Sequence, residues 1–376
     1  MSELLVVAGE ASGDRAAAGV VAALAGHDVR AFGMGGAAMQ AAGVELVSDL
    51  RSSTALGVGE VAARAFSIGA AYARVAHAAR SRRPRAALLV NYTAFNTRLA
   101  HGLHAAGVRV LWYGAPQVWA WRPGRARSLR GAIDRMAVIL PFEEAIWRGE
   151  GVDACYVGHP AREGARLDRS VARAALGLTP TAATVGILPG SRPHEVKKLL
   201  RPMLEAYESV RRDRASVDAR VLLAPSLDAG TRARALADAR AMRVEVTEVD
   251  PEVGLSKLLP AFDASLCASG TASLEAALAR AVPVIAYRVG LLTELAARRL
   301  LRVPYLALPN VLLGRKAFTE LLQKDARAPR LADALAQALD GRDALLLACA
   351  EVEAALGAPR TPSIAVAKML EPWLFR

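Results

Sequence analysis

Short apolar runs alternate with helical patterns along the whole chain. The first series of runs predicts six strands: Leu4–Val7, Val29–Phe32, Ala87–Val90, Val108–Trp112, Arg135–Ile139 and Ala154–Val157. A second series predicts five more: Thr184–Leu188, Ala219–Leu223, Arg243–Thr247, Ala264–Ala268 and Val282–Ala286. Strands separated by helices are typical of parallel sheets with helices on both faces.

The two series are similar in size, which predicts two doubly wound, Rossmann-like α/β domains that face each other across a cleft. The break falls near Gly158-His159-Pro160, before the helical stretch Ser170–Leu176. We therefore expect a first domain over residues 1–160 and a second over residues 161–356. A last helix within residues 357–376 is expected to pack back on the first domain.

The first predicted strand runs into the loop Gly9-Glu10-Ala11-Ser12-Gly13-Asp14, before a helix predicted over Arg15–Ala25. Such a loop lets a ligand approach the backbone, and the unpaired N–H groups at the helix start suit phosphate or sugar hydroxyls. The loop is neither a dinucleotide fingerprint nor a P-loop. It carries two carboxylates, Glu10 and Asp14, which a site for phosphate alone would avoid. The candidate substrate contacts are Gly9, Ser12 and Gly13.

Two further glycine turns follow predicted strands of the second domain. Ser191 and Arg192 precede a helix expected over Glu195–Tyr207, and Arg192 suits bidentate contact with a phosphate. The second turn precedes a helix expected over Ala272–Leu278, and its candidate residues are Ser269, Gly270, Thr271 and Glu275. Its hydroxyls and N–H groups would hold a diphosphate and Glu275 a ribose. An ordinary N-cap explains one such turn, but two at strand ends of one sheet favour a nucleotide.

A later segment adds four candidates for the same site. Asn310 and Arg315 lie in a predicted loop, from which they would reach the sugar or the diphosphate. Glu320 and Gln323 are predicted to share one face of a following helix at i, i+3 spacing. An ordinary solvated helix face explains the last two equally well.

Two tryptophans alternate after a strand of the first domain. Trp119 and Trp121 would form the wall of a sugar or acyl site. The alternative is that one indole packs in the core while the other is partly exposed.

Composition limits the partners. The chain has 376 residues, of which 53% are hydrophobic, and it carries a net charge of +12, which indicates a globular protein rather than a disordered one. Because the basic residues are spread out and no nucleic-acid-binding motif appears, an anionic membrane surface or substrate is favoured over RNA or DNA. Three scattered cysteines fit a reducing compartment. No secretory pattern opens the sequence, so a cytoplasmic location is expected.

Nine segments in order resemble the lipid-A-disaccharide synthase family over nearly the whole chain. They are Gly9-Glu10-Ala11-Ser12-Gly13-Asp14, Gly33-Met34-Gly35-Gly36…Met39, Leu56-Gly57-Val58-Gly59-Glu60-Val61, Pro116-Gln117-Val118-Trp119-Ala120-Trp121, Leu140-Pro141-Phe142-Glu143, Gly158-His159-Pro160, Pro189-Gly190-Ser191-Arg192, Ala268-Ser269-Gly270-Thr271…Glu275 and Leu308-Pro309-Asn310…Gly314-Arg315. Each segment is weak evidence alone, but the combination is highly specific.

The resemblance implies a GT-B glycosyltransferase that needs no metal and no cofactor. Its partners would be UDP-2,3-diacylglucosamine and the 6-hydroxyl of 2,3-diacylglucosamine 1-phosphate, with inversion at the anomeric carbon. It also implies a peripheral protein on the inner face of the bacterial inner membrane, no nucleic acid, and leaves a homodimer open. The stretch Val61–Tyr72 is a candidate for a helix that lies in the membrane interface, with an ordinary packing helix as the alternative.

The chain departs from the family at the residue proposed as general base. Where the family usually has Asp-Ala-Pro-Asp-Phe-Asn, this chain has Asn91-Tyr92-Thr93-Ala94-Phe95-Asn96. Asn91 therefore replaces the first Asp, and Ala94 the second. Because an amide nitrogen is not basic at neutral pH, Asn91 would only orient the acceptor hydroxyl. A nearby Ser of the family is also replaced, by Ala115.

Four hypotheses remain open from the sequence. The favoured one is a working synthase in which another carboxylate, Glu10, Asp14 or Glu60, is the base, with Glu10 the leading candidate. The second is a related glycosyltransferase with another acceptor, and the third a non-catalytic UDP-sugar-binding protein. A basic nucleic-acid binder is the fourth, and it predicts steeply salt-dependent binding that UDP does not compete with.

Overall fold

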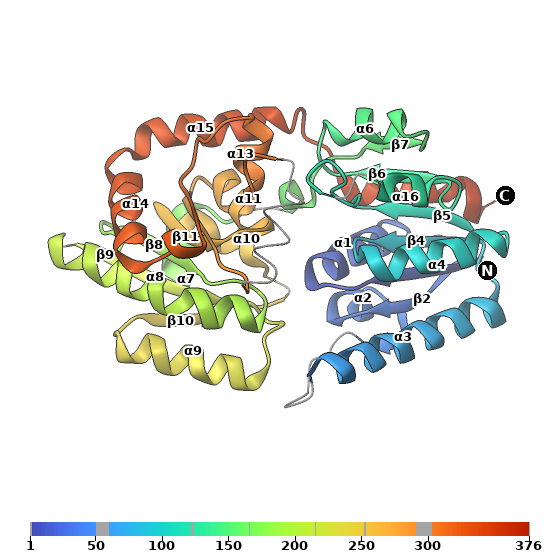
Figure 1. Cartoon of the computed structure of the whole chain (residues 1–376), viewed down its shortest axis with the longest axis horizontal. Coiled ribbons are helices and arrows are strands. Elements are labelled where there is room, and N and C mark those ends of the chain that lie inside the picture. Colours follow the sequence, from blue (N-terminus) through green and yellow to red (C-terminus); the bar gives the residue numbers. More distant parts are fainter. Residues whose placement is uncertain are drawn as a thin grey trace. The chain divides into compact units, whose positions relative to one another are not determined.

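The computed structural model in Figure 1 describes residues 2–49, 60–121, 124–164, 166–214, 216–251, 253–290 and 303–375, with only the backbone of residues 60–65. The chain forms two compact units. The first unit is Met1–Glu163 with Pro359–Arg376, and the second unit is Gly164–Ala358.

The first unit contains a parallel sheet of seven strands in the order β3-β2-β1-β4-β5-β6-β7. The strands are β1 (Ser2–Ala8), β2 (Val29–Gly35), β3 (Glu45–Asp49), β4 (Ala86–Val90), β5 (Arg109–Tyr113), β6 (Arg135–Val138) and β7 (Ala154–Tyr156). The helices are α1 (Ala11–Ala23), α2 (Ala37–Ala41), α3 (Glu60–Arg82), α4 (Thr93–Ala105), α5 (Arg125–Leu129), α6 (Glu143–Gly149), the 3-10 turn η2 (Pro160–Arg162) and α16 (Pro362–Leu374).

Helices cover both faces of this sheet, and the alternating side chains of each strand supply two cores. Leu5 and Val7 of β1 belong to the core that includes Val75 of α3, whereas Leu4 and Val6 belong to the core that includes Leu370 of α16. Figure 1 shows α16, coloured red, among the blue and teal elements of this unit. The last helix of the chain thus completes the core of the first unit.

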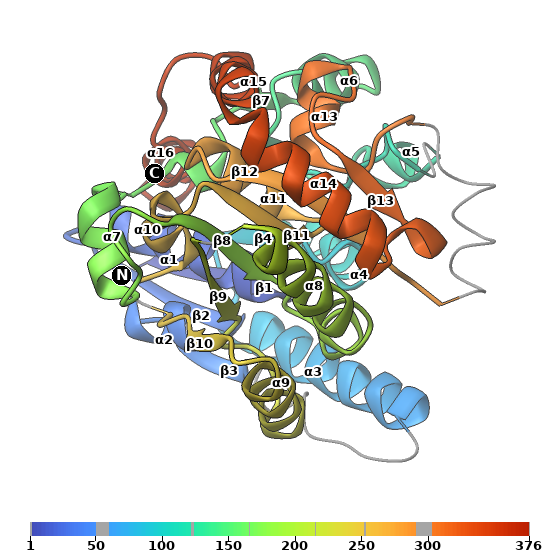
Figure 2. The same cartoon turned by 90° about the vertical axis from the view of Figure 1, so that its left-hand side faces the viewer.

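The second unit contains a parallel sheet of six strands in the order β10-β9-β8-β11-β12-β13. The strands are β8 (Ala183–Leu188), β9 (Val217–Leu223), β10 (Glu245–Glu248), β11 (Ala264–Ala268), β12 (Val282–Tyr287) and β13 (Glu320–Leu322). The helices are α7 (Arg169–Ala175), α8 (Pro193–Asp213), α9 (Ala229–Ala241), α10 (Leu255–Leu258), η3 (Leu259–Ala261), α11 (Thr271–Leu278), α13 (Leu308–Leu313), η4 (Gln323–Asp325), α14 (Ala328–Asp340) and α15 (Arg342–Ala355). Helices α8 and α14 pack against each other beside this sheet (Figure 2).

Every strand expected from the apolar runs is present, but two edge strands are additions. β3 was not predicted, because its residues are mostly polar and half-buried. The expected helix over Glu320 and Gln323 is wrong: Glu320 begins the short edge strand β13 and Gln323 begins the 3-10 turn η4. A three-residue strand with one neighbour carries too short a pattern to be recognised.

Candidate active site

The carboxyl-terminal ends of β1, β4 and β5 bring three predicted segments together. The N–H of Asn91, just after β4, donates to the carbonyl of Tyr113 at 3.0 Å. A Cβ atom at Gly114 would lie 2.1 Å from Oδ1 of Asn91, and one at Gly13 would lie 3.8 Å from its Nδ2. The amide of Asn91 therefore lies between the glycine after β5 and the first turn of α1.

The backbone after β4 adopts an uncommon conformation. Asn91 and Tyr92 have φ angles of 48° and 43°, in the left-handed region that side chains other than glycine rarely adopt. The ring of Tyr92 covers Gly9, where a Cβ atom would lie 2.0 Å from its Cγ. It also stacks on Phe95, with ring centroids 5.2 Å apart. Such backbone strain is concentrated at functional sites, where the surrounding packing must hold it in place.

Asp14 has a structural role that the sequence did not reveal. Its buried carboxylate accepts hydrogen bonds from the N–H groups of Gly36, Ala38 and Met39, at 2.7, 3.0 and 3.1 Å. These groups are at the start of α2, so Asp14 caps that helix and lies at its positive end. We therefore withdraw Asp14 as a candidate base.

Glu10 differs from Asp14 in exposure and position. It is exposed, has an extended backbone with φ −146°, and precedes the first turn of α1, where its side chain makes no capping hydrogen bond. Because β1 pairs with β4 through Ala8 and Val90, Glu10 and Asn91 follow adjacent strands at the same sheet edge. The backbone of Glu60 begins α3, but its side chain lies outside the described residues.

Glu143 was not among the predicted site residues, although it belongs to one of the segments that resemble the family. In the structure it lies beside Trp119. The indole N–H of Trp119 donates to Glu143 at 3.0 Å, and the N–H of Leu140 donates to its other carboxylate oxygen at 3.1 Å. The carboxyl group is 1% exposed, and burial raises its pKa to about 7. The burial of Glu143 and its raised pKa follow from the tertiary structure. The only local sign of a functional role for this residue is therefore the Leu-Pro-Phe-Glu sequence after a strand.

The two tryptophans have different surroundings. Trp119 is half-buried and also packs edge-on against Phe142, with ring centroids 5.1 Å apart. Trp121 is 37% exposed, and the guanidinium of Arg125 lies 4.6 Å from its ring centroid. Only Trp121 therefore presents much of its ring to a ligand.

In the second unit, the turn after β8 is fixed by a carboxylate. Glu195 accepts from the N–H groups of Ser191 and Arg192 at 3.1 and 3.2 Å, and pairs with the Arg192 guanidinium at 3.3 Å. Gly190 has φ +117°, and a Cβ atom there would lie 2.3 Å from Glu195. Ser191 is exposed, as is about half of the Arg192 side chain. The turn is rigid, while its polar groups remain accessible.

The turn after β11 lies next to it, because β8 and β11 are paired strands. Gly270 has φ +146° and open space where a Cβ atom would be. Gly270 and Thr271 are exposed at the start of α11, and Ser269 is half-buried. Glu275, one turn into the helix, is buried. The accessible N–H groups and hydroxyls at this helix start suit a phosphate.

Asn310 and Glu320 are fully engaged within the second unit. Asn310 is 0% exposed, accepts from the N–H groups of Ala317 and Phe318, and donates to Glu320 at 2.7 Å. Glu320 also accepts from the N–H of Leu306 at 3.0 Å. The amide of Asn310 thus holds the segment before β13, and its contact with the sugar stays a prediction.

Gln323 and Arg315 are likewise held by neighbours. Gln323 has φ +52° and accepts from the N–H of Val289 at 2.8 Å. Arg315 pairs with Glu351 of α15, and both side chains are half-exposed. Neither residue is shown to reach the turns after β8 and β11.

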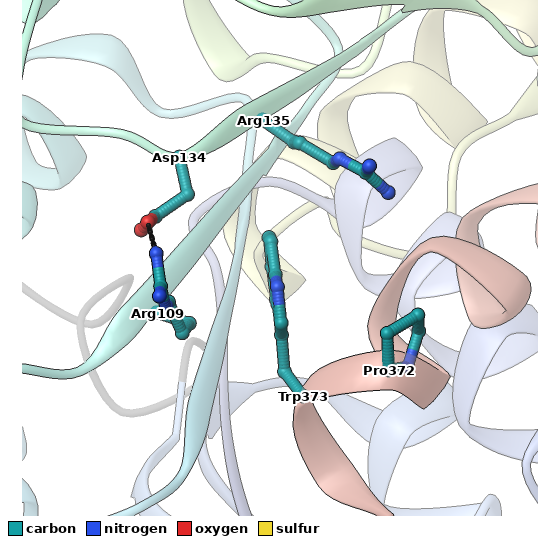
Figure 3. Close-up of a pocket in the computed structure, with 5 residues that line it drawn as sticks. All are labelled: Arg109, Asp134, Arg135, Pro372 and Trp373. Carbon is teal, nitrogen blue, oxygen red and sulfur yellow. Dashed lines mark hydrogen bonds and ion pairs between the residues drawn. The ribbon is translucent and has the colours of Figure 1, made fainter. Parts of the chain in front are cut away.

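A cavity of about 540 Å³ lies at the amino-terminal ends of the strands of the first sheet, away from the loops described above (Figure 3). Arg109 and Arg135, at the starts of β5 and β6, line it with the indole of Trp373. Arg109 pairs with Asp134 at 2.6 Å and Arg135 with Asp153 at 3.0 Å. Because each arginine has its own carboxylate, this cavity has no charge surplus to attract an anion.

Two features are absent from the described parts of the chain. No group of three or more His, Cys, Asp or Glu side chains there is arranged to hold a metal ion. No helix there has the length and apolar character needed to cross a bilayer.

Solved structures identify the fold. The putative UDP-N-acetylglucosamine 2-epimerase from Listeria monocytogenes superposes with a TM-score of 0.65 at 11% identity, covering 99% of this chain and 96% of that one. The UDP complex of S. aureus MnaA gives 0.67 at 11% identity, covering 100% and 97%. The spinosyn rhamnosyltransferase SpnG gives 0.58 at 15% identity, covering 99% and 100%. The chain thus has the GT-B type of fold, as the resemblance implied.

Sequence relatives identify the family. The family model for lipid-A-disaccharide synthetase matches residues 4–352. The lipid-A-disaccharide synthase of Myxococcus xanthus is 40% identical over 375 residues, covering 98% of this chain and 97% of that relative. That of Anaeromyxobacter dehalogenans is 39% identical over 366 residues, covering 96% and 94%. The chain therefore belongs to the lipid-A-disaccharide synthetase family, a family of hexosyltransferases.

Proposed function

We propose that this protein is an inverting glycosyltransferase that forms lipid A disaccharide 1-phosphate. It moves 2,3-diacylglucosamine from UDP to the 6-hydroxyl of 2,3-diacylglucosamine 1-phosphate. Family membership supports the reaction class. The observation that carries the donor half is the pair of accessible glycine turns after the neighbouring strands β8 and β11.

The donor half of the mechanism uses the second unit. The sugar–phosphate bond breaks as the new glycosidic bond forms, so negative charge develops on the departing UDP. Arg192, the hydroxyls of Ser191 and Thr271, and the N–H groups at the start of α11 stabilise that charge. Glu275 remains our proposed partner for the ribose.

The acceptor half uses the carboxyl-terminal edge of the first sheet. A base must remove the proton from the 6-hydroxyl as its oxygen attacks the anomeric carbon. We assign that role to Glu10, because it is exposed and follows β1, which pairs with β4, the strand before Asn91. Asp14 instead caps α2. Asn91 orients the hydroxyl by hydrogen bonding. Glu60 is retained as the alternative base on sequence grounds.

The lipid substrates place the enzyme at a membrane surface in this proposal. We propose that it is peripheral on the inner face of the bacterial inner membrane. The net charge of +12 favours anionic lipids. On α3, Phe66 is 81% exposed, whereas Ile68 and Tyr72 pack against the core of the first unit. Phe66 is thus the described apolar side chain of this helix that suits insertion between lipids.

The proposal is tested by incubating the purified protein with UDP-2,3-diacylglucosamine and 2,3-diacylglucosamine 1-phosphate. Formation of the disaccharide 1-phosphate together with UDP is the expected result. Arg192→Gln serves as the variant with a weakened donor site, and Arg234→Gln, at an exposed position of α9, is the matched control. Absence of disaccharide from a folded protein that binds UDP contradicts the proposal.

One observation favours a second candidate, a relative with another acceptor or a UDP-sugar-binding protein without activity. In the resemblance given above, Asn91 and Ala94 stand at the positions where the family pattern has carboxylates. A panel of other acylated sugars distinguishes the two forms: transfer to one of them indicates another acceptor. UDP binding without transfer to any of them indicates a binding protein.

A further inference from the structure

A second cavity, of about 420 Å³, lies within the second unit at the opposite edge of its sheet from the turns after β8 and β11. It is bounded by α7, by the residues before β8 and β11, and by the junction of α14 and α15. Among the described residues that line it, four are arginines and one is an aspartate: Arg169, Arg173, Arg214, Arg342 and Asp263. The proposed reaction gives this cavity no role.

Asp263 is the centre of the cluster. Its carboxylate pairs with Arg169 at 2.6 Å, with Arg173 at 2.9 Å and with Arg342 at 3.1 Å. It also accepts from the N–H and the hydroxyl of Thr184, both at 3.0 Å. One carboxylate therefore serves three guanidinium groups in addition to a strand N–H.

The arginines divide into one that is enclosed and three at the rim. Arg173 is 8% exposed at its side chain and donates to the carbonyl of Ala261 and to the Thr184 hydroxyl as well as to Asp263. The side chains of Arg169, Arg214 and Arg342 are 40%, 31% and 27% exposed. Arg173 thus belongs to the scaffold, and the other three face the opening.

Arg342 has a donor that its carboxylate does not use. Its Nε lies 3.1 Å from Asp263, yet this buried atom has no hydrogen-bond partner among the described residues. The ion pair is therefore close in distance but poorly directed.

The cluster also carries surplus positive charge. Asp263 is the one carboxylate among the described lining residues, and Arg214 pairs outside the lining with Asp340 at 2.6 Å, so the lining itself is predominantly positive. Burial lowers the pKa of Arg173, and repulsion from Arg169 and Arg342 adds to this effect. In the cavity of Figure 3, by contrast, Arg109 and Arg135 each have their own aspartate.

We propose that this cavity binds a phosphate group through Arg169, Arg214 and Arg342, at a site separate from the donor turns. The guanidinium forks of these three arginines match the oxygens of a phosphate in charge and in geometry. Free phosphate and the head group of a phospholipid share this chemistry.

The test is a titration of the full-length protein with inorganic phosphate in saturating UDP, at constant ionic strength, with heat of binding as the readout. UDP keeps phosphate from the proposed donor turns. We expect Arg342→Gln and Arg214→Gln each to weaken phosphate binding roughly tenfold or more, since each removes a charge-assisted contact. The matched control Arg109→Gln, which removes an arginine from the charge-balanced cavity, keeps wild-type affinity.

Arg214→Gln protects the test against misfolding, because the Arg214–Asp340 pair is on the surface and such pairs add little stability. Unchanged UDP affinity shows that each variant is folded. Phosphate binding that is absent in saturating UDP, or that survives both substitutions, overturns the proposal.

The two sources are distinguished with vesicles of phosphatidylcholine, with and without phosphatidic acid. If phosphatidic acid recruits wild type but not Arg214→Gln, the ligand is a lipid head group. If recruitment is the same for both while the phosphate titration separates them, the ligand is free phosphate.

Discussion

The two sheets of this protein share a topology, but the loops at the carboxyl-terminal ends of their strands differ in chemistry. In each unit the strand order reverses between two neighbouring strands, β1 and β4 in the first and β8 and β11 in the second, and ligands of open α/β sheets bind at such points. After β1 and β4 the chain carries Glu10 and Asn91, whereas after β8 and β11 it carries Arg192 and the open start of α11. In the proposed function, one topology serves for proton transfer in the first unit and for diphosphate binding in the second, and the loop residues decide which.

The loops at the carboxyl-terminal ends of the first sheet also depend more on buried carboxylates for their conformation. Asp14 holds the start of α2, and Glu143 holds Trp119 and the turn after β6. In the second unit, Glu195 fixes the turn after β8, and Gly270 at the start of α11 has open space around it. This difference predicts that damage to the two edges will appear in different measurements.

The largest effect on stability is expected from Asp14→Ala. The substitution leaves three N–H groups at the start of α2 without their acceptor, which should lower the free energy of unfolding by about 2–4 kcal/mol. All five tryptophans lie in the first unit, so urea unfolding followed by their fluorescence reports on that unit. The matched cap of the second unit, Asp228→Ala on α9, should leave this signal unchanged. Equal shifts from both variants would contradict the separation.

Next in size is the pH dependence contributed by Glu143. Burial raises its folded-state pKa to about 7, above its value in the unfolded chain, so the folded state holds this proton more tightly. Its contribution is complete below about pH 4.5 and is lost as pH rises through 7, by about 3 kcal/mol in total. Glu143→Gln should therefore flatten the decline in unfolding free energy of the first unit from pH 5 to pH 8. Trp119→Phe, which removes the indole N–H, should steepen it, and identical slopes for all three proteins would contradict this account.

A smaller effect is expected at the second edge from Arg192→Gln. The side chain is about half exposed, so its loss should leave stability unchanged and weaken UDP binding about tenfold. Calorimetric titration with UDP measures this change. The neighbouring His194→Gln, at another exposed position at the start of α8, is the control. Equal loss from both substitutions would mean that the charge of Arg192 is not what the nucleotide requires.

The sheets could be predicted because their strands are buried on both faces. β4 and β11 are five consecutive buried residues, a pattern that a buried parallel strand produces and a surface loop does not. The edge strands β3 and β13 are short, partly polar and paired on one side, so their residues form no comparable apolar run. The i, i+3 spacing of Glu320 and Gln323 fits a helix as well as it fits the strand and the 3-10 turn that they begin.

The candidate site was harder to predict because a residue type does not reveal its partner. Glu10 and Asp14 are four residues apart and both acidic, yet one is exposed and the other caps a helix more than twenty residues later. Asn310 was predicted to contact the sugar, but in the structure its amide donates to Glu320 and accepts from the N–H of Phe318. Only tertiary contacts separate an accessible polar side chain from one that holds the fold.

The central claim is that the loops after β1 and β4 in the first unit supply the base, and that the loops after β8 and β11 in the second unit bind the nucleotide. Its most direct measurement is steady-state turnover together with UDP affinity for wild type, Glu10→Gln and Asn91→Asp. Glu45→Gln, at the start of β3, is the control. The account predicts that Glu10→Gln lowers kcat by about 10²–10⁴ with UDP affinity unchanged, and that Asn91→Asp changes kcat less than about tenfold. Wild-type turnover in Glu10→Gln, with a rise of orders of magnitude in Asn91→Asp, would contradict it.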